Sequence, residues 1–253
     1  MPPHHLTLGG LDCQVYDELP RDAPPRIGVV LCHGFGAPAT DLVPLAPALL
    51  RLEPGLREFV RFVFPAAPLS LDAEGLLGGR AWWPLDIQRL VLATEQSELR
   101  DLREEIPKGL QKSSDLLTAL VDEWSEGTGL SMDRIVLGGF SQGAMLATDV
   151  SLRLPERPGA LCVFSGTLTA EPEWRDLAAL RGALPVFQSH GLQDPLLPFE
   201  AAEWLRDMFL EAGLPVDFLP FEGGHTIPQE ALVRVAALLE RLIAEEEAEE
   251  EIE

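Results

Sequence analysis

Short apolar segments alternate with longer segments of helical periodicity along most of this chain, and that alternation is its strongest constraint on a fold. Strand-sized apolar runs predict strands at residues 27–32, 59–64, 134–137, 161–164, 185–188 and 216–220, with a further edge strand at 11–16. Between them, apolar side chains recur every three or four residues at 42–52, 110–124, 144–154, 200–212 and 228–244. This order predicts an α/β fold in which helices cover both faces of a mainly parallel sheet.

The chain is expected to form one domain followed by a short acidic tail. Its 253 residues contain neither an internal repeat nor a Ser/Gly linker, and single α/β domains often reach this length. We therefore expect one domain over residues 1–244. Residues 245–253 are almost all glutamate, and we expect this self-repelling run to be disordered.

Composition argues against several classes of function. A net charge of −22 disfavours a nucleic-acid partner, because phosphate binding depends on clustered Lys and Arg. No apolar run approaches the roughly 20 residues of a membrane-spanning helix, and the first residues lack the pattern of a secretory signal. The cysteines, Cys13, Cys32 and Cys162, form an odd and sparse set, so we expect reduced thiols in a cytoplasmic protein.

Two stretches interrupt the regular pattern. Residues 66–86 are rich in glycine and proline and predict a long loop, which in a compact domain is often functional. Residues 90–105 form a polar helical stretch. The segment 90–108 could either lie over the mouth of a site as a lid or extend a surface helix.

The strongest chemical signal is Gly139-Phe140-Ser141-Gln142-Gly143, which lies between a predicted strand and a predicted helix. This arrangement is typical of a nucleophile elbow, in which serine occupies a strained turn and glycines stand where side chains have no room. The hydroxyl then projects above the sheet, and the helix N-terminus favours developing negative charge. The five-residue pattern is weak alone, but its strand-to-helix context makes Ser141 the candidate nucleophile.

A serine nucleophile needs a base, and position narrows the histidines to two. His4 and His5 lie at a terminus expected to be mobile. His33 precedes the serine, whereas in this fold the acid and the histidine follow it. Of the remaining His190 and His225 we favour His225, because it stands between the last predicted strand and the last predicted helix, in a loop that can hold an imidazole over the sheet edge.

The acid that orients this imidazole should lie on a loop at the carboxyl end of a strand. Asp194 follows the strand predicted at 185–188 and meets this requirement. Other aspartates lie on or beside predicted helices, or within a strand where alternation can turn them to solvent: Asp149, Asp176, Asp207 and Asp217. The sequence therefore predicts a catalytic triad of Ser141, Asp194 and His225.

Acyl transfer also needs N–H donors for the oxyanion of the tetrahedral intermediate. The residue after the nucleophile, Gln142, supplies the first. We expect the second from Phe35, in the glycine-rich turn that follows the strand predicted at 27–32, and we expect His33 to brace that turn.

Two tryptophans in the irregular stretch, Trp82 and Trp83, are candidates to wall a substrate pocket or close over it, with core packing as the alternative. The histidines are not paired on one helix and no Cys/His cluster exists, so the sequence predicts neither a metal site nor a cofactor. It leaves the oligomeric state open.

Four motifs occur together in a fixed order: HGFGA at 33–37, GGFSQGA at 138–144, HGLQDPLLP at 190–198 and GGHTIP at 223–228. They resemble the phospholipase/carboxylesterase family, which includes the acyl-protein thioesterases, over about residues 26–240. The resemblance implies the α/β-hydrolase fold and a small-molecule ester or thioester substrate. By this resemblance the family's triad, its oxyanion donors and its tryptophan-containing loop correspond to Ser141, Asp194 and His225, to Phe35 and Gln142, and to residues 80–87.

Three features differ from many acyl-protein thioesterases. Ala37 stands where an acidic residue is common, the tryptophan loop carries an extra Trp-Pro, and residues 90–108 are longer. These features favour a bacterial-type carboxylesterase for short to medium acyl chains, with thioester or lysophospholipid hydrolysis as the alternative. A non-catalytic binding protein would be expected to have a damaged triad, which is intact here, and an acyltransferase would form esters from an added alcohol.

Overall fold

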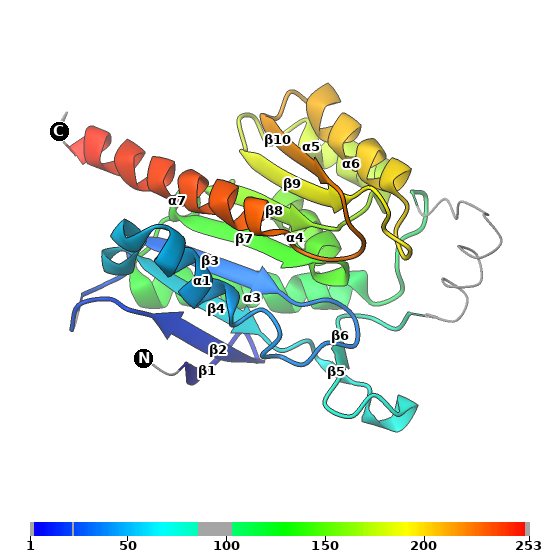
Figure 1. The fold of residues 1–253 in the computed structure, drawn as a ribbon, viewed down its shortest axis with the longest axis horizontal. Coiled ribbons are helices and arrows are strands. Elements are labelled where there is room, and N and C mark those ends of the chain that lie inside the picture. Colours follow the sequence, from blue (N-terminus) through cyan, green and yellow to red (C-terminus); the bar gives the residue numbers. More distant parts are fainter. Residues whose placement is uncertain (1–2, 22, 86–102, 251–253) are drawn as a thin grey trace.

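Eight strands form one twisted sheet in the order β1-β2-β4-β3-β7-β8-β9-β10 (Figure 1). The computed structural model describes residues 3–21, 23–85 and 103–250. Neighbouring strands from β4 to β10 pair in parallel, whereas β1 pairs with β2, and β2 with β4, in antiparallel fashion. The strands are β1 (His4–Leu8), β2 (Leu11–Asp17), β3 (Ile27–Cys32), β4 (Val60–Pro65), β7 (Ile135–Phe140), β8 (Ala160–Phe164), β9 (Val186–Gly191) and β10 (Val216–Phe221).

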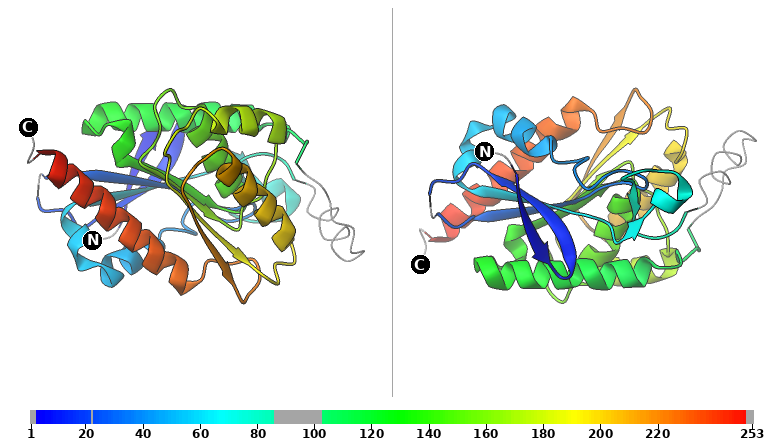
Figure 2. Two further views of the ribbon diagram at one scale, coloured as in Figure 1. Left: turned by 90° about the horizontal axis from the view of Figure 1, so that it is seen from above. Right: turned by 90° about the horizontal axis from the view of Figure 1, so that it is seen from below.

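Helices cover both faces of the sheet, as Figure 2 shows. One face is covered by α1 (Leu45–Leu52) and α7 (Gln229–Glu250), and the other by α3 (Leu110–Thr128), α4 (Gln142–Arg153), α5 (Glu171–Ala178) and α6 (Phe199–Glu211). Short 3₁₀ helices occur at Pro54–Glu58, Asp72–Glu74 and Met132–Arg134. This arrangement confirms the α/β fold, with a mainly parallel sheet between two helical layers.

Side-chain alternation along the central strands divides the core into two layers. In β3, Val30 and Cys32 pack in the layer under α3 and α4, while Val29 and Leu31 pack in the layer under α1 and α7. Successive residues of a strand point to opposite faces, so a strand buried on both faces must be apolar throughout. This is why the apolar runs alone were sufficient to locate these strands.

Two strands extend further than their apolar runs predicted. β7 continues through Phe140 and β9 through Gly191, because residues at their carboxyl ends still pair with neighbouring strands. Pairing therefore carries both strands as far as the positions from which the candidate catalytic loops leave the sheet.

The N-terminal hairpin and one helix differ from expectation. The strand predicted at an edge, β2, lies inside the sheet, because β1 pairs with its outer side. Most of β1 is exposed, so it has no apolar run in the sequence. Helix α5 was not predicted, since its sequence is polar and only Trp174 and Ala178 are buried.

The irregular stretches also have more structure than the sequence indicated. Residues 66–85 include a small hairpin of β5 (Leu69–Ser70) and β6 (Arg80–Ala81). Helix α7 extends to Glu250, into the acidic run that was expected to be disordered. Most of the helical stretch predicted at 90–105, and of the possible lid at 90–108, lies outside the described residues. None of the helices described is long and apolar enough to cross a membrane.

Candidate active site

Ser141 lies on a sharp turn between β7 and α4. Its backbone has φ 54° and ψ −116°, a left-handed conformation that L-residues rarely adopt. A Cβ atom on Gly143 would overlap the carbonyl oxygen of Cys32, and one on Gly139 would overlap that of Gly143. Glycine is therefore required on both sides of the serine, because the end of β3 and the start of α4 leave no space for a side chain.

Asp194 and His225 are joined by a hydrogen bond of 2.6 Å from His225 Nδ1 to Asp194 Oδ2. The other carboxylate oxygen accepts hydrogen bonds from the backbone N–H groups of Leu196 at 2.8 Å and Leu197 at 2.9 Å. Burial by itself would raise the pKa of Asp194, but the hydrogen bond from His225 and those from the two backbone N–H groups outweigh it and hold the pKa below its usual value. Asp194 is thus kept ionised, with one oxygen committed to the imidazole.

The loops that carry these two residues leave the carboxyl ends of β9 and β10, which are adjacent parallel strands. Backbone hydrogen bonds of 2.9 Å join Leu192 N to Phe221 O and Gln193 N to Gly223 O. A Cβ atom on Gly191 would overlap the carbonyl oxygen of Gly223, so the two loops lie in direct contact. The strand pairing therefore fixes the acid relative to the histidine.

Ser141 and His225 both line a cavity with a volume of about 330 Å³ at the carboxyl edge of the sheet. The Phe140 ring lies against the His225 imidazole, with 4.7 Å between ring centroids. The cavity walls are mainly apolar, with charged side chains contributed by Asp41, Glu105 and Lys108. The remaining lining residues are Gly34, Phe35, Ala37, Trp83, Pro84, Leu85, Ile106, Pro107, Gln142, Met145, Thr169, Leu196 and Leu197.

Both residues predicted to donate to an oxyanion, Phe35 and Gln142, line this cavity. Gln142 is the first residue of α4, and the first N–H groups of a helix have no acceptor within the helix. Phe35 lies in the turn after β3, which is tied to β6 by Gly36 N–Arg80 O at 2.8 Å and Arg80 N–Ala37 O at 3.1 Å. Both N–H groups thus belong to segments that line the same cavity as Ser141.

His33 braces this turn, as the sequence predicted. Its Nε2 accepts a hydrogen bond from Ala67 N at 3.1 Å, and its Nδ1 lies 2.8 Å from Gly34 O. These partners require a neutral ring with the proton on Nδ1. Burial lowers the pKa of His33, which also favours the neutral form.

The structure assigns the two tryptophans different roles. Trp83 lines the cavity, whereas Trp82 is not among the lining residues, and its indole Nε1 donates to His33 O at 2.9 Å. Of the two tryptophans expected at a substrate pocket, the structure places Trp83 at the cavity and Trp82 against the turn after β3. Trp82 is turned inward because its indole N–H has a carbonyl partner there.

The Gln142 side chain has a structural role that the sequence analysis missed. Its Oε1 accepts from Trp82 N and its Nε2 donates to Trp83 O, both at 2.9 Å. The amide thereby joins the start of α4 to the tryptophan loop. No local signal could have indicated this, because its partners lie about 60 residues away.

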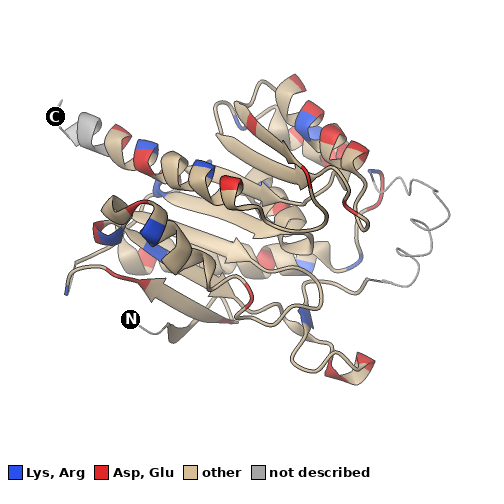
Figure 3. Ribbon diagram, in the orientation of Figure 1, with Lys and Arg blue, Asp and Glu red and all other residues tan. Residues whose placement is uncertain are grey.

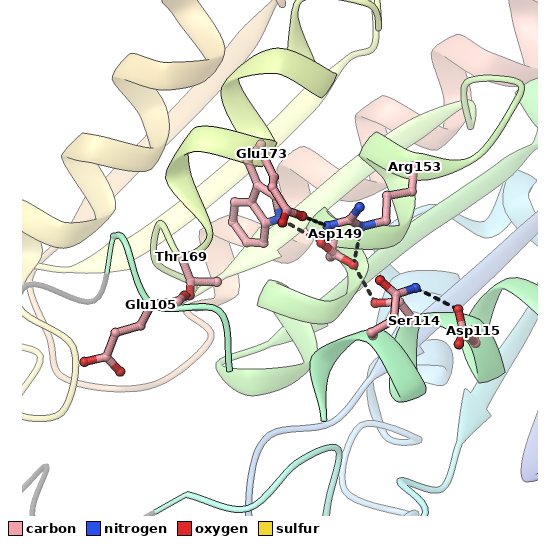
Figure 4. A network of polar contacts seen from close by, with 9 residues as sticks. Glu105, Ser114, Asp115, Asp149, Arg153, Thr169 and Glu173 are labelled. Atoms are coloured by element: carbon pink, nitrogen blue, oxygen red, sulfur yellow. Dashed lines mark hydrogen bonds and ion pairs between the residues drawn. The ribbon is translucent and has the colours of Figure 1, made fainter. Parts of the chain in front are cut away.

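The other aspartates that the sequence analysis weighed lie elsewhere. Asp149 belongs to a buried network beneath α4, shown in Figure 4. Asp217 is exposed on β10 and pairs with Arg234 at 2.6 Å. Cys13, Cys32 and Cys162 are buried free thiols. In the described parts of the chain, no group of three or more His, Cys, Asp or Glu side chains is arranged to hold a metal ion.

The chain is similar to known proteins both in sequence and in fold. A family model described as phospholipase/carboxylesterase matches residues 19–243. Acyl-protein thioesterase 1 of Eremothecium gossypii is 32% identical over 190 residues, covering 75% of each chain, and that of Kluyveromyces lactis is 30% identical over 189 residues, covering 74% of this chain and 77% of that protein.

Solved structures of an esterase and of a carboxylesterase share the fold of this chain. The crystal structure of esterase PE8 has a TM-score of 0.74 and 27% identity, covering 96% of this chain and all of that one. A carboxylesterase from Mesorhizobium loti has a TM-score of 0.70 and covers 94% of this chain and 99% of its own. At 18% identity it shows the shared fold alone.

Proposed function

The chain belongs to the phospholipase/carboxylesterase family of α/β-hydrolases, and from this membership we propose that it is a serine carboxylesterase. It is a hydrolase of the esterase and thioesterase class. The proposed substrates are small-molecule carboxylic esters with short to medium acyl chains, hydrolysed through an acyl-enzyme on Ser141. The observation that carries this proposal is the Asp194–His225 pair beside a strained serine in one apolar cavity.

In the proposed mechanism, His225 is the general base. Its Nδ1 proton is committed to Asp194, so the lone pair on Nε2 is available to take the proton of Ser141 as the hydroxyl attacks the ester carbonyl. The imidazolium then protonates the leaving alcohol. In the second step His225 activates a water molecule, which hydrolyses the acyl-enzyme and frees the serine. Asp194 stabilises the imidazolium at both stages.

The backbone N–H groups of Phe35 and Gln142 are the proposed donors to the oxyanion of each tetrahedral intermediate. They need no reorganisation during the reaction, since His33 and the Gln142 side chain hold their segments in place. Loss of one such donor typically lowers kcat by about 10²- to 10³-fold.

The size of the cavity supports the choice of acyl chain. At about 330 Å³ it lies at the lower end of the roughly 300–1,000 Å³ range of small-molecule sites. Thioester hydrolysis is the second candidate function, because relatives at 30% and 32% identity are named acyl-protein thioesterases. It would use the same residues. The buried free thiols support a reducing, cytoplasmic environment.

The test is hydrolysis of p-nitrophenyl esters from acetate to palmitate by the wild-type protein and by Ser141→Ala. We expect a rate that is highest for short to medium chains and falls on the order of 10³-fold or more in the variant, which has no nucleophile. A maximum at palmitate would favour the thioesterase candidate instead. Wild-type protein that is folded but no faster than Ser141→Ala on every ester would contradict the proposed function.

A further inference from the structure

His190 is a second histidine beside Asp194, and the proposed mechanism does not use it. It lies near the end of β9 with its side chain fully buried. Its Nε2 is 2.8 Å from Leu197 O and 3.4 Å from Asp194 Oδ2. Asp194 Oδ2 is the same oxygen that accepts the hydrogen bond from His225.

The surroundings of His190 determine where its proton lies. Both neighbours of Nε2 are acceptors, a carbonyl and a carboxylate oxygen, so Nε2 must carry the hydrogen. Nδ1 is buried without a hydrogen-bond partner. Burial lowers the pKa of His190, which agrees with a neutral ring. The imidazole is therefore a fixed donor on Nε2.

We propose that His190 is a positioning residue for the reaction, which holds the Asp194 carboxylate in the orientation that His225 requires. This inference rests on the proposed function, because it takes the Asp194–His225 pair as catalytic. The direct bond to Leu197 O fixes the residue whose N–H in turn binds Asp194 Oδ1, and the longer contact to Oδ2 opposes rotation of the carboxylate.

The same bond connects the acid to the substrate cavity. Leu196 and Leu197 line that cavity, and their N–H groups are the donors to Asp194 Oδ1. Without the His190 bond, the segment 194–197 would keep its backbone bonds, including Asp194 N to Gly191 O at 3.3 Å, but Leu197 would lose the side-chain bond that ties it to β9. Release of this segment would move the carboxylate and one wall of the cavity together.

The chain offers a matched control on the same strand and the same face. Gln188 is also fully buried, and its Nε2 donates to Ala202 O at 2.8 Å, so it too ties β9 to a backbone carbonyl. It has no contact with Asp194 among those described. Gln188→Leu should lower the thermal midpoint without affecting the triad.

The experiment compares His190→Leu, His190→Gln and Gln188→Leu with the wild type. His190→Leu removes the donor, whereas His190→Gln can place an amide N–H near the position of Nε2. For each folded variant, ester hydrolysis is measured together with the low-field ¹H NMR resonance of the His225 Nδ1 proton in the absence of substrate. This resonance reports the Asp194–His225 hydrogen bond whether or not the protein hydrolyses esters.

We expect His190→Leu to lower kcat about 10- to 100-fold and to shift or broaden the low-field resonance, since a small displacement of a catalytic group is costly. His190→Gln should retain most of kcat and most of the low-field resonance. Gln188→Leu should change neither kcat nor the resonance. The proposal is overturned if His190→Leu keeps the resonance and kcat, or if Gln188→Leu alters them equally. An inactive wild-type protein that shows the resonance would count against the proposed function and leave the positioning role to be judged on the resonance alone.

Discussion

The residues around Ser141 hold its backbone in a conformation that costs a non-glycine residue about 1–3 kcal/mol. Packing around the turn compensates for this conformational strain, because Gly139 and Gly143 allow β3 and α4 to approach the turn without side chains between them. A single methyl group at either glycine should therefore disturb the nucleophile more than its size suggests.

Gly143→Ala tests this directly. The added Cβ would overlap Cys32 O, so α4 must move, and both Ser141 and the Gln142 N–H would move with it. We expect kcat to fall at least 100-fold, by the loss of donor and nucleophile geometry together. The matched control is Gly127→Ala in α3, where a Cβ meets no atom within 4 Å and should stabilise the helix by about 0.5–1 kcal/mol. Normal activity in Gly143→Ala would show that the turn can relax.

At this scale the sequence revealed residues that belong to a recognisable motif, and it missed bonds that buried polar side chains make outside those motifs. Ser141 was identifiable because its glycines and its strand-to-helix position are contiguous. The bracing bonds of Trp82 and Gln142 were not, because their partners lie 49 to 60 residues away in the chain. The partners of His190, Asp194 and Leu197, are close in sequence, but only the folded loop brings them to its imidazole. The sequence around a buried polar side chain does not indicate which carbonyl group it will bind.

At the scale of elements, a buried polar network joins three helices on one face of the sheet (Figure 4). The Asp149 carboxylate on α4 accepts hydrogen bonds from Ser114 on α3 at 2.5 Å and from Trp174 on α5 at 2.8 Å. It also forms an ion pair with Arg153 at 2.9 Å, which in turn bonds to Glu173 on α5. The network therefore fixes α4, the helix that begins directly after Ser141, at a point away from the cavity.

We predict that Asp149→Ala lowers the free energy of unfolding by about 3–5 kcal/mol, because it leaves the Ser114 and Trp174 donors without an acceptor and removes one of the two carboxylates that pair with Arg153. Activity per folded molecule should be nearly unchanged, because Asp149 does not line the cavity. Chemical denaturation gives the stability. Asp115→Ala, one position from Ser114 but exposed, should cost no more than about 0.5 kcal/mol. Similar losses for both variants would argue against the network.

The sequence predicted elements best where burial on both faces made a strand continuously apolar, as in β3 and β8. It failed where an element is mostly exposed. β1 is held by its pairing to β2, and α5 by Trp174, so neither needs a periodic apolar face. The periodicity of apolar residues indicates that one face of an element is buried, and it does not reveal elements that are held by a few contacts.

At the scale of the molecule, negative charge is distributed over the helices of both layers, as Figure 3 shows. The net charge is −22, and Asp41 and Glu105 line the cavity together with Lys108. A field of this sign lowers the local concentration of anionic substrates, over a distance of about 10 Å at 0.1 M salt.

We therefore expect discrimination by leaving-group charge if thioesters are cleaved. The value of kcat/KM for hexanoyl-coenzyme A should be about tenfold or more below that for the uncharged hexanoyl-N-acetylcysteamine at low salt. Added NaCl should bring the two kcat/KM values closer together, because it screens the repulsion between the protein and coenzyme A. The shared acyl chain controls for fit to the cavity. If the ratio of the two kcat/KM values does not change with salt, steric contacts rather than charge distinguish the two thioesters.

The order of strands in the sheet also bears on how the protein is made. After the β1–β2 hairpin the chain forms β3 and β4, continues with β7 on the other side of β3, and then adds β8, β9 and β10 outward in one direction. Synthesis proceeds from the N-terminus, so Ser141 leaves the ribosome before Asp194, and Asp194 before His225. A nascent chain thus carries the proposed nucleophile well before the proposed base that would activate it, and we expect it to become reactive only once the last strand and helix have been added.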